Sequence, residues 1–280
     1  MKIRTDLALE CREMFAGEIS GVESTSHDSD GITVTHVNIK TPEGEARIGK
    51  PIGSYITIEI DNMLCQDDEI EERGENAVGN ELKKLIKDKN TDSVLIVGLG
   101  NQYITPDSIG PKTVGKVTVT RHITSEAKLG FDFDIRPVSA VAPGVLGITG
   151  IETGEIVKGV VEHVKPTLVI AVDALAARKI SRLGTTVQIS DTGISPGSGV
   201  GNNRKELTEK TLGVPVIAIG VPMVVDATTL AMDIMGNHAR IKNELIENGR
   251  GMILTPNDVD AISNTASDII SGGINMALHS

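Results

Sequence analysis

Two short aliphatic runs, each followed by an aspartate, constrain the fold of this chain more than any other feature. The first run is Val94–Gly98, and Asp107 follows it within the segment Thr105–Pro111. The second run is Leu168–Val172, and Asp173 follows it directly. Apolar runs of this length, bounded by Gly and Pro, are typical of strands covered on both faces, as in a parallel sheet. Because ligands bind beyond the carboxyl ends of such strands, we expect both aspartates at one edge, as a candidate acid–base pair.

The rest of the chain alternates between strand and helix patterns. Residues 33–39 and 55–60 alternate with period two, as half-exposed strands do, and Pro42–Gly44 between them indicates a turn. The first thirty residues show no clear period. Strands that alternate with helices predict an α/β three-layer sandwich with a mostly parallel central sheet. Further strands are expected at 117–120, 138–141, 185–190 and 215–220, and helices at 67–88, 154–164, after Asp226 and from Thr255 to about Ala277.

Composition limits the function classes. A chain of 280 residues can bury a full core, which must be aliphatic because there is no Trp and there are only three Phe. The net charge of -11, without a basic cluster, argues against binding to nucleic acid or to anionic lipid. Cys11 and Cys65 are too few to staple a protein of this size, and the start lacks a signal peptide. We therefore expect a soluble, cytoplasmic protein with no membrane span and reduced thiols.

Each candidate site residue also has a structural interpretation. Thr105-Pro106-Asp107 can simply start a helix, and Asp173 can be an N-cap, although an unpaired acid after so apolar a run is costly to bury. The glycine-rich loop that contains Gly197, Ser198, Gly199 and Arg204 is a possible substrate contact, but it lacks the P-loop ending. The six His residues show no metal-ligand spacing, so we expect neither a metal nor an organic cofactor.

A series of short blocks, in one order along most of the chain, resembles a known family. The blocks are Arg4–Ala8, Val97–Asn101, Thr105–Asp107, Gly110–Pro111, Arg136–Val138, Pro143–Val145, Gly150–Thr153, Asp173–Arg178, Gln188–Asp191, Pro196–Asn202 and Gly220–Asp226. They are similar to the germination protease of endospore-forming bacteria. The resemblance implies an atypical aspartic endopeptidase, made as a self-processing zymogen, that degrades small acid-soluble spore proteins during germination in the spore core.

The resemblance also implies a fold related to the hydrogenase maturation proteases and phosphorylase-like enzymes. The essential aspartates of the family fall on Asp107 and Asp173, and the family assembles as a homotetramer. The chain departs from the family in two places. Only three residues precede Arg4, and the segment between Asp226 and Met252 is shorter than usual.

The segment Thr5–Glu10 looks like the recognition sequence of the family's substrates, which reads Thr-Glu-(Phe or Ile)-Ala-Ser-Glu with cleavage after the first Glu. By this resemblance, residues 1–6 are a short propeptide, 7–280 form a single peptidase domain, and the chain matures by a cut between Asp6 and Leu7. The alternative is that Leu7 and Leu9 pack onto the core while the acids are solvated.

The pair would share one proton, because two close carboxylates cannot both ionise easily. One would take a proton from water and the other would polarise the scissile carbonyl. Two rival interpretations remain open from the sequence. One is a small-molecule enzyme of similar architecture, such as a nucleoside phosphorylase or a nickel-binding maturation factor. The other is a binding protein in which both aspartates only cap helices.

Overall fold

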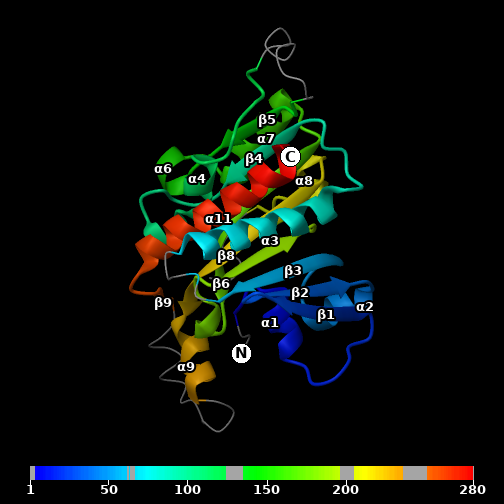
Figure 1. Cartoon of the computed structure of the whole chain (residues 1–280), viewed down its shortest axis with the longest axis vertical. Helices are drawn as coiled ribbons and strands as arrows, with labels where there is room; N and C mark the ends of the chain where they lie inside the picture. The colour runs from blue at the N-terminus through cyan, green and yellow to red at the C-terminus, as the bar shows by residue number, and fades with distance from the viewer. Residues whose placement is uncertain are drawn as a thin grey trace.

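Nine strands of the described part of the chain form one mixed sheet (Figure 1). The computed structural model describes residues 4–61, 63, 67–123, 135–195, 205–235 and 251–279. The sheet order is β1-β2-β3-β7-β8-β6-β4-β5, and β9 pairs with β8. The strands are β1 Val22–Ser29, β2 Ile32–Ile39, β3 Gly53–Ile60, β4 Val94–Gly98, β5 Val138–Val141, β6 Leu168–Ala177, β7 Thr186–Ser190, β8 Val216–Asp226 and β9 Ile253–Leu254.

The sheet divides into a parallel and an antiparallel half. Strands β8, β6, β4 and β5 run parallel to one another. Strands β1, β2, β3 and β7 pair antiparallel, and β8 pairs antiparallel with both β7 and β9. The predicted α/β class is confirmed, but the prediction of a mostly parallel sheet is wrong, because the sheet is mixed. In the antiparallel half, β1 and β2 are joined by the two-residue turn Asp30-Gly31, in which both residues have positive φ. Such a turn can connect only antiparallel strands.

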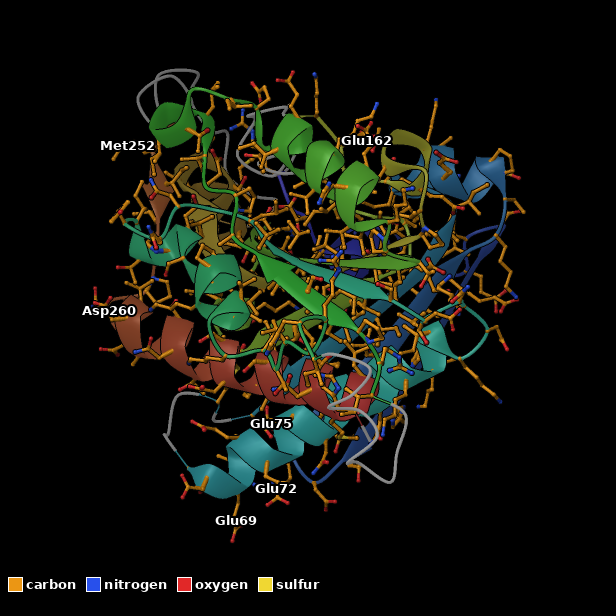
Figure 2. All side chains as sticks on the ribbon, turned by 90° about the horizontal axis from the view of Figure 1, so that it is seen from above. Glu69, Glu72, Glu75, Glu162, Met252 and Asp260 are labelled. Carbon is orange, nitrogen blue, oxygen red and sulfur yellow. The ribbon has the colours of Figure 1, made fainter. Side chains whose placement is uncertain are left out.

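Helices cover both faces of the parallel half (Figure 2). The long helices α3 (Asp68–Ile86) and α11 (Val259–His279) pack on one face, together with α4 (Ile109–Val114). On the other face, α7 (Thr153–Val164) and α8 (Glu209–Leu212) contribute Val157, Val161 and Leu212 to a second apolar cluster. The remaining elements are α1 Ala8–Glu13, α2 Pro42–Ile48, η2 Thr105–Asp107, α6 Leu146–Thr149, η3 Ile180–Arg182 and α9 Ala227–Met235.

Several predicted elements differ from the structure. The turn expected at Pro42–Gly44 is the first turn of α2, because the Thr41 side chain accepts a hydrogen bond from Gly44 N (3.2 Å) and caps the helix. No strand forms at 117–120, where Thr120 instead bonds to the start of β5 through Val138. Helices predicted at 67–88 and 154–164 are confirmed as α3 and α7. No helix among the described residues is long and apolar enough to cross a membrane.

Candidate active site

Asp173 lies inside a strand, which corrects the prediction that it directly follows one. Strand β6 continues through Asp173 to Ala177, because the small apolar residues after the acid keep pairing with the equally long β8. Asp173 pairs with Gly220 of β8. Its side chain is buried, and Oδ1 accepts a hydrogen bond from Ala174 N at 2.9 Å.

Asp107 ends the short 3-10 helix η2, between β4 and α4. Its Oδ2 accepts a hydrogen bond from the backbone N–H of Asn101 at 2.9 Å. The preceding Gly100 has φ +111, and a Cβ there would lie 2.0 Å from the carbonyl oxygen of Asp107. Only glycine allows the loop after β4 to approach η2 this closely. The buried Ser108 hydroxyl lies 3.1 Å from that of Ser263 in α11, which ties the neighbour of Asp107 to the C-terminal helix.

The structure brings the two aspartate-bearing segments together at one edge of the sheet. Leu99 N donates a hydrogen bond to Val172 O (2.8 Å), so the end of β4 lies against the residue before Asp173. Gly110, at the start of α4, packs on the same two residues, and a Cβ there would lie 2.6 Å from Val172 O. Helix η2 therefore contacts both β6 and β8.

A cleft of about 1020 Å³ opens beside Asp173. Its lining includes Asp6, Asp173, Gln188, Ser190 and Asp226. The described residues that line this cleft do not include Asp107. With Glu206, four carboxylates from distant parts of the sequence thus line one cavity. The cleft is large enough for several residues of an extended peptide.

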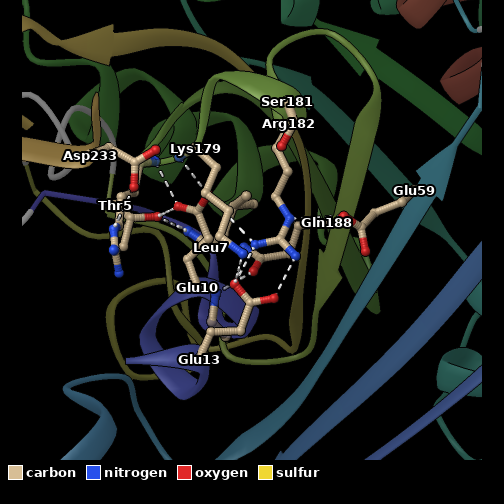
Figure 3. Close-up of polar contacts among 12 residues, drawn as sticks. Thr5, Leu7, Glu10, Glu13, Glu59, Lys179, Ser181, Arg182, Gln188 and Asp233 are labelled. Atoms are coloured by element: carbon tan, nitrogen blue, oxygen red, sulfur yellow. Dashed lines mark hydrogen bonds and ion pairs between the residues drawn. The ribbon is translucent and has the colours of Figure 1, made fainter. Parts of the chain in front are cut away.

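The N-terminal segment forms part of the wall of this cleft. Backbone and side-chain bonds hold it in place, and Figure 3 shows those around Leu7 and Glu10. Asp6 N donates to Ala176 O (2.8 Å), and the Asp6 carboxylate accepts from Ala176 N (2.9 Å). The Gln188 amide bonds on both sides of Leu7. Its Nε2 donates to Asp6 O (3.2 Å), and its Oε1 accepts from Ala8 N (2.7 Å). The segment is therefore bound much as a peptide ligand is bound to a strand.

The apolar side chain after Asp6 fills a dedicated pocket. Leu7 has no exposed surface and clusters with Leu175, Ala177, Leu183 and Val225. Leu9 is buried in a separate cluster with α1 and β2. The packing of both leucines on the core is thus confirmed.

Of the two acids in this segment, Glu10 is not solvated, contrary to the alternative interpretation, whereas Asp6 is half-buried at the cleft wall. Glu10 is fully buried, and its carboxylate accepts hydrogen bonds from Arg178 N (2.7 Å) and Lys179 N (2.9 Å). The Thr5 hydroxyl also donates to it. These three bonds fix Glu10 against the end of β6, where a buried carboxylate needs such donors.

A cluster of charged side chains around Arg182 anchors α1 to η3 (Figure 3). The Arg182 guanidinium makes a bidentate contact with Glu13 (2.7 and 2.8 Å) and bonds Glu59 at 2.9 Å. Burial acts to raise the pKa of Glu13, but hydrogen bonds from Arg182 and Lys179 outweigh it and lower that pKa to about 2. Burial acts to lower the pKa of Arg182, but Glu13 and Glu59 raise it overall.

Sequence reasoning missed most of these contacts. Gln188 falls in one of the blocks that carry the family resemblance, which was the available signal for it. Arg182 and Glu13 carry no local pattern, because their partners lie up to 169 residues away. The predicted substrate-loop residues Gly197, Ser198, Gly199 and Arg204 lie outside the described residues. Within the described residues, no group of three or more His, Cys, Asp or Glu side chains could hold a metal ion.

Fold and site together define an α/β protein with a carboxylate-lined cleft beside β6 and β8, and the N-terminal segment of the chain forms part of its wall. Comparison with known proteins narrows this class. The germination protease family profile matches residues 4–240. The chain belongs to the germination protease family and is a peptidase.

Relatives from several genera support this membership. The germination protease of Caldanaerobacter subterraneus is 47% identical, with 99% of this chain and 94% of the relative covered. That of Clostridium acetobutylicum is 46% identical over 99% of this chain and 95% of its own length. That of Bacillus pumilus is 48% identical, over 83% of this chain and 66% of its own length. The resemblance noted in the sequence is confirmed, and it decides against a small-molecule enzyme or a non-catalytic binding protein.

Proposed function

We propose that this peptidase degrades small acid-soluble spore proteins during germination, and that Asp107 and Asp173 activate the attacking water. The observation that carries the proposal is the cleft that Asp173 lines, where the N-terminal segment Arg4–Asp6 forms part of the wall and Asp6 bonds the backbone of Ala176 on β6. Its site of action would be the cytoplasm of the germinating spore.

The proposed chemistry needs one ionised and one protonated carboxylate. Asp107 is assigned as the base, because it is half-buried whereas Asp173 is buried, and burial favours the neutral form of a carboxyl group. It would take a proton from water as the water oxygen attacks the peptide carbonyl carbon. Asp173, on the buried strand, would hold the proton that polarises this carbonyl and later passes to the leaving nitrogen. No metal or organic cofactor enters these steps.

We propose further that the chain is a zymogen that cuts itself between Asp6 and Leu7, so that 1–6 is a propeptide and 7–280 the peptidase domain. In the structure, Gln188 holds the Asp6 carbonyl and Leu7 is buried, so the segment must loosen before the bond can be attacked. Acidification would supply that change by altering the protonation of the Asp107–Asp173 pair. The family's homotetramer and its structural kinship to hydrogenase maturation proteases and phosphorylase-like enzymes belong to the same proposal.

Intact mass and N-terminal sequencing across a pH series test the maturation step. The full chain should stay intact at neutral pH and yield a product that begins at Leu7 after acidification. Asp173→Asn should block this product at every pH. An intact N-terminus in fully active enzyme, or processing that persists in Asp173→Asn, would refute the self-cleavage.

A further inference from the structure

Asp226 stands at a junction between the fold and the cleft. It is the last residue of β8, and α9 follows it directly. Its Oδ1 accepts hydrogen bonds from Thr229 N (2.9 Å) and from the Thr229 hydroxyl (3.1 Å). Its Oδ2 bonds Arg4 Nη1 at 3.4 Å. The side chain is only 8% exposed, and it lines the same cleft as Asp173.

The two oxygens of Asp226 therefore have different roles. The bonds from Thr229 are a helix cap, and a neutral Asn would provide that cap as well. The second oxygen contributes nothing to the cap. It lies at the cleft wall, where it pairs with the Arg4 guanidinium of the N-terminal segment. An acid is a favourable helix cap in its own right, so a second role is indicated by the position of Oδ2, which bonds Arg4 beside the cleft and takes no part in the cap.

The position of Arg4 in the segment indicates which residue of a substrate Asp226 would contact. Arg4 lies two residues before Asp6, and Asp6 precedes the bond that we propose is cut. Asp6 bonds the backbone of Ala176, and Leu7 fills the pocket formed with Leu175 and Val225. Arg4, Asp6 and Leu7 thus each meet a different part of the fold, while the Thr5 hydroxyl between the first two bonds Glu10. The segment therefore indicates which side chain each of these positions accepts.

We infer that Asp226 is a specificity-determining residue that selects a basic side chain two residues before the acid at the cut. When residues 1–6 leave, the Arg4 guanidinium leaves with them. A substrate that brings Lys or Arg to the same place restores the ion pair, and one that brings a neutral or acidic side chain does not. This inference rests on the proposed peptidase function and extends it to substrate choice.

Synthetic peptides test this with the full chain. The first peptide copies residues 2–14, with Ser in place of Cys11 to prevent oxidation. Three others carry Lys, Ala or Glu in place of Arg4. The chain is acidified and returned to neutral pH, and kcat/KM for the bond after Asp6 is measured by mass spectrometry. We expect the Arg and Lys peptides to be cleaved about 5- to 30-fold faster than the Ala peptide, and the Glu peptide slowest. This factor is smaller than for a fully buried charge-assisted bond, because the Arg4 side chain is 42% exposed.

Asp226→Asn provides the decisive comparison, because Asn keeps an oxygen for the Thr229 cap but carries no charge. The Arg-to-Ala ratio should fall to about 1 in this variant. Asp233→Asn is the matched control, since Asp233 is an acid of α9 that pairs with Arg178 at 3.4 Å and does not line the cleft. It should retain the wild-type ratio.

The outcomes separate the inference from the function on which it rests. Equal cleavage of the Arg and Ala peptides by the wild-type chain would overturn the inference and leave the peptidase function standing. An Arg-to-Ala ratio that is unchanged in Asp226→Asn would also overturn it, since another group would then recognise the basic side chain. Cleavage of no peptide, together with an uncut N-terminus at every pH, would contradict the proposed function itself.

Discussion

Glu13→Gln should remove most of a pH-dependent anchor of the N-terminal segment. Glu13 joins α1 to Arg182 of η3 by two hydrogen bonds of 2.8 and 2.7 Å. A pKa lowered from 4.5 to about 2 corresponds to about 3 kcal/mol of stability at neutral pH. Because the side chain is 31% exposed, solvent screening reduces this to about 1–2 kcal/mol.

The sign of the pH dependence follows from the lowered pKa. The stabilisation is fully present above about pH 4.5, where the carboxylate is charged in both states. It is lost as the pH falls from there through about 2, because the folded protein must then also bind the proton. Wild type and Glu13→Gln should therefore differ by about 1–2 kcal/mol in free energy of unfolding at pH 7. The difference should shrink towards zero at pH 2.

Urea unfolding of both proteins at pH 7, 5, 4 and 3 measures this difference. Glu18→Gln is the control, since Glu18 is exposed and should change stability by less than about 0.5 kcal/mol at every pH. A Glu13→Gln difference that is the same at pH 7 and pH 3 would refute the account, because it would show that the charge does not supply the stabilisation.

Three further perturbations test the site. Gly100→Ala would place a Cβ 2.0 Å from Asp107 O, so kcat/KM should fall about 10²-fold. Gly147→Ala, which has open space around the new Cβ, should keep its activity. Full activity of Gly100→Ala would show that the close contact with Gly100 does not position Asp107. Leu7→Ala leaves a cavity at a fully buried site, so the free energy of unfolding should fall by about 2–5 kcal/mol, or residues 1–6 should be lost faster. Unchanged stability and an unchanged rate of loss would mean that the pocket does not hold the segment. Chelation should leave activity intact, and one metal per chain with activity lost on its removal would refute the carboxylate mechanism.

The strands of the parallel half could be predicted because burial on both faces leaves a direct mark on composition. Val94–Gly98 is buried throughout, as its aliphatic run requires. By contrast, β1 reads Val-Glu-Ser-Thr-Ser-His-Asp-Ser and is mostly exposed, so no apolar period marks it. The Asp30-Gly31 pair was the available signal, because this dipeptide favours the hairpin turn that joins β1 to β2.

The candidate site was only partly within reach of the sequence. The runs before Asp107 and Asp173 predicted one sheet edge, and η2 does contact β6 there. No local pattern reveals that β6 continues past Asp173, since this depends on pairing with the long strand β8. The contacts of Glu10 join residues about 170 positions apart, and only the folded chain brings them together.

The most direct test of the central claim is cleavage of a purified small acid-soluble spore protein by the acid-treated full chain, with fragments identified by mass spectrometry. Asp107→Asn and Asp173→Asn are compared with the wild type, because Asn preserves volume but cannot exchange a proton. We predict fragments that begin after an acidic residue from the wild type, and a rate at least about 10²-fold lower from each folded variant. Near wild-type cleavage by either variant would contradict the assignment of that aspartate to the mechanism.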